Sequence, residues 1–197
     1  MELTVKTKKN KTDLYLDGEF LFTVPSVIWF SSGFREGDDV NKEELLSLKK
    51  EGDSSMAFDS AMRMLSLRAH SEEELRRKLS AKFPKTAVDF ALEKLSGLGL
   101  IDDEKFACLL AEELYERKGF AKKRILFELK NRGIDTESAQ NAVNALDIQE
   151  KIGIIKVIEK SGINENSTKK EKDRVIRRLI NMGYSFSDIS KYIDIYE

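Results

Sequence analysis

The chain has 197 residues, of which 41% are hydrophobic and 35% are charged, with only two prolines. That composition can fill a core and favours long exposed helices over a β-sandwich. The net charge is −1, which excludes a simple polycation. The charge is segregated, however: residues 101–118 carry six acidic and three basic side chains, whereas residues 119–133 carry five basic and one acidic. Local patches of this kind matter more than the sum when the partner is a polyanion.

Cysteine use and hydropathy bear on the compartment. A single cysteine, Cys108, excludes an internal disulfide, and its apolar neighbours predict a small buried side chain. No apolar run approaches the roughly 20 residues that a membrane span needs. The first residues, MELTVKTKKNK, lack the apolar segment of a secretory signal. We therefore expect a soluble protein of a reducing compartment that does not associate with membranes.

The N-terminal 25 residues predict β-structure. Apolar residues alternate on both sides of Asp17-Gly18, which is a strong signal for a hairpin with a type I′ turn. Pro25 is expected to end the second strand because it cannot donate to a neighbouring strand. Trp29 and Phe30 are the expected packing contacts of this small sheet.

A short helix should follow the sheet. Asn41 and Glu44 have the spacing of a capping box, which predicts a helix from Asn41 to about Lys50 that ends at Gly52. A second box, Ser71 with Glu74, opens a later helix.

From residue 54 onward the pattern is helical and repeats at an offset of 50 residues. Leu75, Ile125 and Val175 share one register, and Leu79, Leu129 and Leu179 follow four residues later in each copy. An i, i+4 apolar pair lies on one helical face. A repeat of this length indicates stacked supersecondary units, each too small to hold a large core alone.

These patterns predict a mainly α-helical protein of three tandem three-helix repeats in an elongated curved array, preceded by a β-hairpin and a short helix. The last helix is expected to begin at Ser185 or Ser187 and to carry Ile189, Ile193 and Tyr196. The expected divisions are residues 1–53, 54–100, 101–147 and 148–197.

The second helix of each repeat carries basic residues opposite its apolar face. Such helices could follow the phosphates of a nucleic acid or meet an acidic protein surface, and charge alone does not separate the two. Aromatic side chains for base stacking are few: Phe83 and Phe127 lie in these segments, and we interpret both as core. The candidate filament-binding or nucleic-acid-binding residues are Arg68, Arg76, Arg77, Lys78, Lys122, Lys123, Arg124, Lys130, Arg132, Lys169, Lys170, Lys172, Arg174, Arg177 and Arg178.

Catalytic chemistry has little support. The one histidine, His70, and the one cysteine, Cys108, lie in separate segments without the spacing of a shared metal site. Asp102-Asp103 is better explained as a helix N-cap with favourable charge than as a metal pair. Gly97 and Gly99 lack the third glycine of a dinucleotide-binding loop. We expect no enzyme, no metal and no cofactor.

Four short sequence motifs occur in the same order as in the RecX family of recombination regulators, and the chain resembles that family over nearly its whole length. The first motif is carried by Ala61, Leu65, Arg68, Ser71, Glu74, Leu75 and Leu79. The second and third are carried by Gly99, Ile101, Asp102, Asp103, Phe106 and Ala107, and by Gly119, Ile125, Glu128, Leu129, Gly133 and Ile134. The fourth is carried by Leu179, Gly183, Tyr184, Ser185 and Ile189.

Three positions depart from the family pattern. His70 stands where an arginine is usual, Phe83-Pro84 replaces Lys-Gly, and Met182 replaces an arginine. The changes remove positive charge, and therefore bear on the strength of DNA binding.

The resemblance implies a bacterial cytoplasmic protein that lies in the groove of the RecA–DNA filament, inhibits ATP hydrolysis and strand exchange, and limits filament growth. Its implied partners are the RecA filament and single- and double-stranded DNA, and we expect a monomer. Two other hypotheses about the function remain open. One is an independent DNA-binding protein that acts through backbone electrostatics, and the other is a helical scaffold for an unrelated partner.

Overall fold

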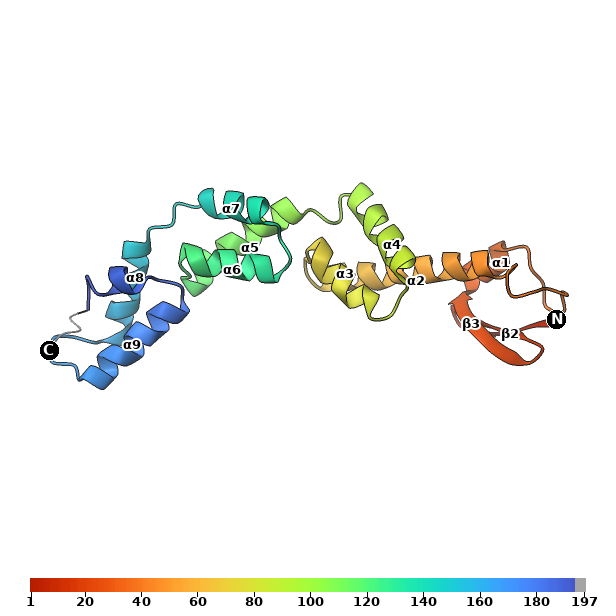
Figure 1. Ribbon diagram of the computed structural model, residues 1–197, viewed down its shortest axis with the longest axis horizontal. Coiled ribbons are helices and arrows are strands. Elements are labelled where there is room, and N and C mark those ends of the chain that lie inside the picture. Colours follow the sequence, from red (N-terminus) through yellow and green to blue (C-terminus); the bar gives the residue numbers. More distant parts are fainter. Residues whose placement is uncertain (194–197) are drawn as a thin grey trace. The chain divides into compact units, whose positions relative to one another are not determined.

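The computed structural model describes residues 1–193 and contains two compact units, Met1–Asp102 and a second that begins at Asp103 (Figure 1). The first unit opens with a three-stranded antiparallel sheet of order β1-β2-β3. Its elements are β1 (Leu3–Lys8), β2 (Lys11–Leu16), β3 (Glu19–Pro25), α1 (Ser26–Ser31), α2 (Leu46–Leu67), α3 (Glu72–Ser80) and α4 (Lys85–Gly97).

The predicted turn at Asp17-Gly18 is confirmed. Both residues have positive φ angles, 48° and 83°, and they join β2 to β3. Type I′ turns need this geometry at both central positions, and asparagine, aspartate and glycine adopt it most readily. The sheet has a third strand, β1, that pairs with β2. Trp29 is buried in its core as expected, but Phe30 is 74% exposed, so the prediction that Phe30 packs there is wrong.

Helix α2 corrects the prediction that Gly52 ends a short helix. Both hydrogen bonds of the capping box form: the Asn41 N–H donates to the Glu44 carboxylate, and the Glu44 N–H donates to the Asn41 side-chain oxygen, with nitrogen–oxygen distances of 2.7 and 3.0 Å. The continuous helix begins at Leu46 and runs through Gly52 to Leu67, across the expected division at residue 53. Gly52 has a packing role, because a Cβ atom there would lie 2.5 Å from Cγ1 of Val24 in β3.

We therefore expect Gly52→Ala to lower the free energy of unfolding of the first unit by roughly 1–3 kcal/mol, the usual range for overpacking. Val24 is fully buried and β-branched, so it has little freedom to move aside. Urea denaturation followed by circular dichroism measures the change. Gly97→Ala is the control, since nothing lies within 4 Å of a Cβ atom at that helical glycine. Equal stability of the Gly52→Ala variant and the wild type would contradict this packing role.

The second unit contains two sets of three helices. They are α5 (Asp103–Lys118), α6 (Lys122–Asn131), α7 (Thr136–Asn144), α8 (Glu150–Ser161), α9 (Lys169–Asn181) and α10 (Phe186–Ile189). The expected last helix is opened by Ser185, whose side chain accepts a hydrogen bond from the Asp188 N–H. Ile193, which was expected on this helix, lies beyond its end at Ile189, and Tyr196, also expected there, lies outside the described residues.

The 50-residue register is confirmed by burial. Its six apolar positions, in α3, α6 and α9, are all at most 6% exposed: Leu75, Leu79, Ile125, Leu129, Val175 and Leu179. They occupy the separate cores of the three helix sets, α2–α4, α5–α7 and α8–α10. The mainly helical fold with three-helix units is thus as predicted, whereas Cys108 is exposed rather than buried.

Within the second unit, the start of α6 is fixed to the segment after α9. The Ala121 N–H donates to the Met182 carbonyl at 2.9 Å, and the Tyr184 hydroxyl donates to the Gly119 carbonyl at 2.8 Å. Burial, with a smaller effect of the Glu150 carboxylate, raises the pKa of Tyr184 to about 12. The hydroxyl therefore stays protonated and remains a donor at neutral pH.

Candidate functional site

The basic residues of α3 are largely neutralised by acidic neighbours. Arg76 is paired with Glu72 at 2.7 Å on its own helix and with Asp89 on α4. Arg77 lies 3.5 Å from Glu73. The helix carries three basic and three acidic side chains. Arg76 and Arg77 therefore already have partners and would have to leave them to meet a phosphate.

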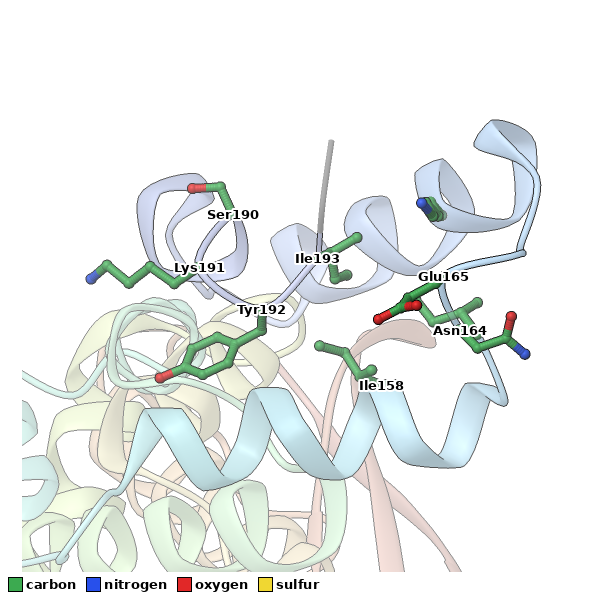
Figure 2. A pocket seen from close by; sticks show the side chains of 9 residues that line it. Ile158, Asn164, Glu165, Ser190, Lys191, Tyr192 and Ile193 are labelled. Atoms are coloured by element: carbon green, nitrogen blue, oxygen red, sulfur yellow. The ribbon is translucent and has the colours of Figure 1, made fainter. Parts of the chain in front are cut away.

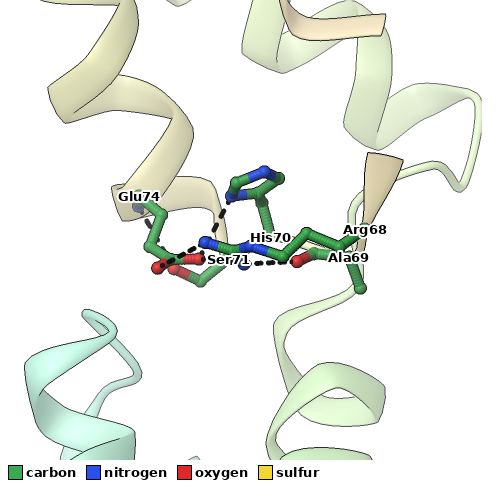
Figure 3. Close-up of polar contacts among 5 residues, drawn as sticks. All are labelled: Arg68, Ala69, His70, Ser71 and Glu74. Carbon is green, nitrogen blue, oxygen red and sulfur yellow. Dashed lines mark hydrogen bonds and ion pairs between the residues drawn. The ribbon is translucent and has the colours of Figure 1, made fainter. Parts of the chain in front are cut away.

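Arg68 belongs to a polar network at the N-terminus of α3 (Figure 3). The Glu74 carboxylate accepts hydrogen bonds from the two terminal guanidinium nitrogens of Arg68 at 3.0 and 3.3 Å. Nδ1 of His70 lies 3.2 Å from the same carboxylate, and the Ser71 side chain accepts from the Glu74 N–H. This last bond confirms the N-cap role predicted for Ser71. Arg68 therefore supports the local fold of the first unit.

His70, which replaces a usual arginine, is only 5% exposed. Its burial lowers the pKa of the imidazole, the nearby positive charges of Arg68 and Lys78 lower it further, and Glu74 opposes them. Because protonation is less favourable in the folded chain, we expect the unfolding free energy to fall as the pH drops below about 6.5, the value for an unfolded histidine. Above that pH, His70 is neutral in both the folded and the unfolded chain, and the unfolding free energy keeps its full value.

This pH effect is measurable because the chain has one histidine. The imidazole proton resonances should titrate below 6.5, and urea unfolding should show a loss of stability between pH 7.5 and 5.5. In a His70→Gln variant the loss should be smaller, since the carboxylates with lowered pKa values titrate at lower pH. A folded-state pKa at or above 6.5 would contradict the assignment.

Helix α6 divides its predicted cations into two kinds. Lys122, Lys123 and Lys130 are exposed. Arg124 is half-buried: it pairs with Glu128 at 2.6 Å, and its buried Nε atom has no hydrogen-bond partner among residues 1–193. A Cβ atom at Gly183 would lie 2.6 Å from Arg124 Cβ, so the residue also packs against the segment after α9. Arg124 therefore serves packing, which the charge pattern did not reveal.

Among residues 1–193, helix α9 presents a large set of cations without an ion pair. Its buried face is apolar, formed by Val175, Ile176 and Leu179. Its start is fixed by the Glu171 carboxylate, which accepts from the Thr168 N–H and hydroxyl at 2.8 Å each; these bonds lower the pKa of Glu171. Among residues 1–193, six cations of α9 form no ion pair: Lys169, Lys170, Lys172, Arg174, Arg177 and Arg178.

The predicted residues are divided between the two units. Arg68, Arg76, Arg77 and Lys78 lie in the first unit, and those of α6 and α9, with Arg132, lie in the second. The i, i+4 spacing of Glu72 with Arg76 and of Glu73 with Arg77 could have predicted the neutral charge of α3. Asp89 could not be foreseen, because it comes from the next helix.

A hollow beside α9 is lined by side chains of α8, α9 and the segments that follow α8 and α10 (Figure 2). Its lining residues are Ile158, Ile163, Asn164, Glu165, Lys172, Ser190, Lys191, Tyr192 and Ile193. It combines one carboxylate with two ammonium groups, without a nucleophile paired to a base. Within residues 1–193, no three histidine, cysteine or acidic side chains gather as a metal site. None of the helices over the same residues is long and apolar enough to span a membrane.

Comparisons with known proteins agree with this arrangement. Family models that describe the first and second three-helix domains of RecX match residues 57–95 and 102–143, which run from within α2 into α4 and from α5 into α7. These two matches support membership of the RecX family. A regulatory protein RecX from Caldanaerobacter subterraneus subsp. tengcongensis is 25% identical over 96% of this chain and 95% of its own. Another, from Clostridium beijerinckii, is 27% identical over 95% and 90%.

Solved RecX structures share the fold. A crystal structure of a regulatory protein RecX aligns with a TM-score of 0.63 over 99% of both chains, at 18% identity. RecX from Lactobacillus salivarius aligns with a TM-score of 0.60 over 71% of this chain and 93% of its own, at 22% identity. At these identities the two structures show that the fold is shared.

Proposed function

We propose that this RecX-family protein lies in the groove of the RecA–DNA filament and inhibits RecA ATP hydrolysis, strand exchange and filament growth. Family membership supports RecA as the partner. The observation that carries the proposal is the exposed cationic face of α9, which has no ion pair among residues 1–193. A filament that contains DNA offers regularly spaced phosphates, and cations without partners bind these without first breaking an ion pair.

The acidic residues of α5 give the proposal a second element. Glu112 and Glu116 are exposed on a helix of the same unit, beside Glu113, which is paired with Arg117 at 3.1 Å. Carboxylates are repelled by phosphate and fit basic patches of a protein. A unit with cations on α9 and carboxylates on α5 therefore suits a partner made of both protein and nucleic acid.

Binding to assembled filaments tests the proposal. Cys108, the single and exposed cysteine, accepts a maleimide fluorophore. We expect the anisotropy of the labelled protein to rise on addition of RecA–single-stranded DNA filaments and to fall again with added salt. No rise at saturating filament would contradict filament binding.

Independent DNA binding is the second candidate, since the same cations would serve it. It requires affinity for naked duplex comparable to that for the filament. Each phosphate contact should then contribute about 0.9 to the slope of log affinity against log salt. Tighter binding to the filament than to naked duplex at one salt concentration would favour the RecA-directed function.

A further inference from the structure

One aromatic residue of the second unit interrupts the charge pattern of the repeat. In the 50-residue register, Phe127 on α6 corresponds to Arg77 on α3 and to Arg177 on α9. We expected Phe127 to be core, but 53% of it is exposed, so that prediction is wrong. An exposed phenylalanine thus stands where the other two repeats present a cation.

The ring of Phe127 contacts a cation that also contacts a second aromatic ring. The Arg124 guanidinium lies 5.2 Å from the centre of the Phe127 ring and 5.6 Å from that of Phe120. The Lys118 ammonium lies 5.7 Å from the Phe120 ring. Because Glu128 holds Arg124 at 2.6 Å, the guanidinium that supports Phe127 is itself fixed. The exposed ring is therefore ordered before any ligand arrives.

Charge around the ring fits a phosphate backbone. Lys123 and Lys130 lie four residues before and three residues after Phe127, so they flank it on one helical face. Both are exposed, and neither forms an ion pair with any of residues 1–193. The nearest acidic residue along the helix, Glu128, is occupied by Arg124.

A single ring among cations distinguishes two classes of partner. Protein interfaces bury clusters of apolar side chains. On α6, Phe127 is the one large apolar side chain with more than a third of its surface exposed. One ring between ammonium groups matches an unpaired nucleotide, which offers a π face for stacking and an anionic phosphate on each side.

We propose that Phe127 is a base-stacking site for single-stranded nucleic acid, with Lys123 and Lys130 contacting the phosphates that flank the stacked base. The proposal deepens the proposed function by naming the strand that the second unit would contact. It concerns direct binding to the strand, so it is testable without RecA.

Anisotropy of two fluorescein-labelled strands of equal length tests it, one of thymidines and one with abasic sites throughout. Base stacking is worth about 1–3 kcal/mol per base, so Phe127→Leu should weaken binding of the thymidine strand roughly 5-fold or more. The same change should leave the abasic strand unaffected, and Phe127→Trp should restore thymidine binding. Lys123→Gln with Lys130→Gln should weaken both strands.

Phe90→Leu is the matched control, since Phe90 on α4 is exposed to a similar extent, 48%, and should not affect either strand. Two results would overturn the proposal. One is equal binding of the thymidine strand by Phe127→Leu and wild type. The other is an equal loss for both strands. Retained strand binding with lost RecA-filament binding would show that the ring contacts protein, which also overturns it. Failure of RecA inhibition in the wild type would instead count against the proposed function alone.

Discussion

Replacing Arg177 and Arg178 on α9 by glutamine is expected to weaken binding to RecA–DNA filaments roughly tenfold or more. Both side chains are exposed, and neither has an ion pair among residues 1–193. A hydrogen bond to a charged group contributes about 1.5–3 kcal/mol, so the loss of even one phosphate contact has this effect. The slope of log affinity against log salt concentration should also become shallower, by about 0.7–0.9 for each phosphate contact removed.

The matched control removes two charges from α3. Arg76 and Arg77 are paired with Glu72, Asp89 and Glu73. Changing both to glutamine should reduce filament affinity less than about threefold, since paired cations are not available to phosphate. Melting temperatures of both variants must be measured, because Arg76 also joins α3 to α4. An equal or larger loss in the α3 variant would contradict the assignment of α9 as the main cationic surface.

Gly183→Ala should lower the free energy of unfolding of the second unit by roughly 2–5 kcal/mol. Gly183 has a φ angle of +95°, a conformation that costs an L residue about 1–2 kcal/mol. In addition, its Cβ atom would lie 2.6 Å from Arg124 Cβ and 2.8 Å from the Arg124 backbone nitrogen. Overpacking of this kind costs about 1–3 kcal/mol, and a backbone atom cannot rotate away.

Gly162→Ala separates the two causes. Gly162 also has a positive φ angle, +73°, but nothing lies within 4 Å of a Cβ atom there. It should therefore lose only the backbone part. Urea denaturation of both variants gives the comparison. Equal destabilisation would show that the close approach of Arg124 to Gly183 has no energetic consequence.

The sequence predicted the fold well where the pattern is local and periodic. The register of Leu75, Ile125 and Val175 follows from helical spacing alone, as does the Ser71 cap. The Asp17-Gly18 turn follows from its backbone preference. Gly52 was misjudged because a glycine that ends a helix and one that allows close packing look alike in a sequence. The two are distinguished only by the position of Val24, which is far from Gly52 in the sequence but adjacent to it in the fold.

The candidate site was less predictable, because charge on one helix depends on its neighbours. Arg76 is as basic as Arg177 in the sequence, yet Asp89 from another helix neutralises it. Phe127 has the apolar character of a core residue, but the core position in each repeat is taken by the residue two places earlier, Ile125 in α6. Partners that come from other helices require the tertiary structure.

The most direct test of the proposed function is RecA ATP hydrolysis on single-stranded DNA at one moderate salt concentration, with increasing amounts of this protein. We expect inhibition, complete at less than one molecule per RecA, because a regulator that limits filament growth acts on many RecA subunits at once. The Arg177→Gln, Arg178→Gln variant should need at least several times more protein. An unchanged rate of hydrolysis at saturating wild-type protein would contradict the account.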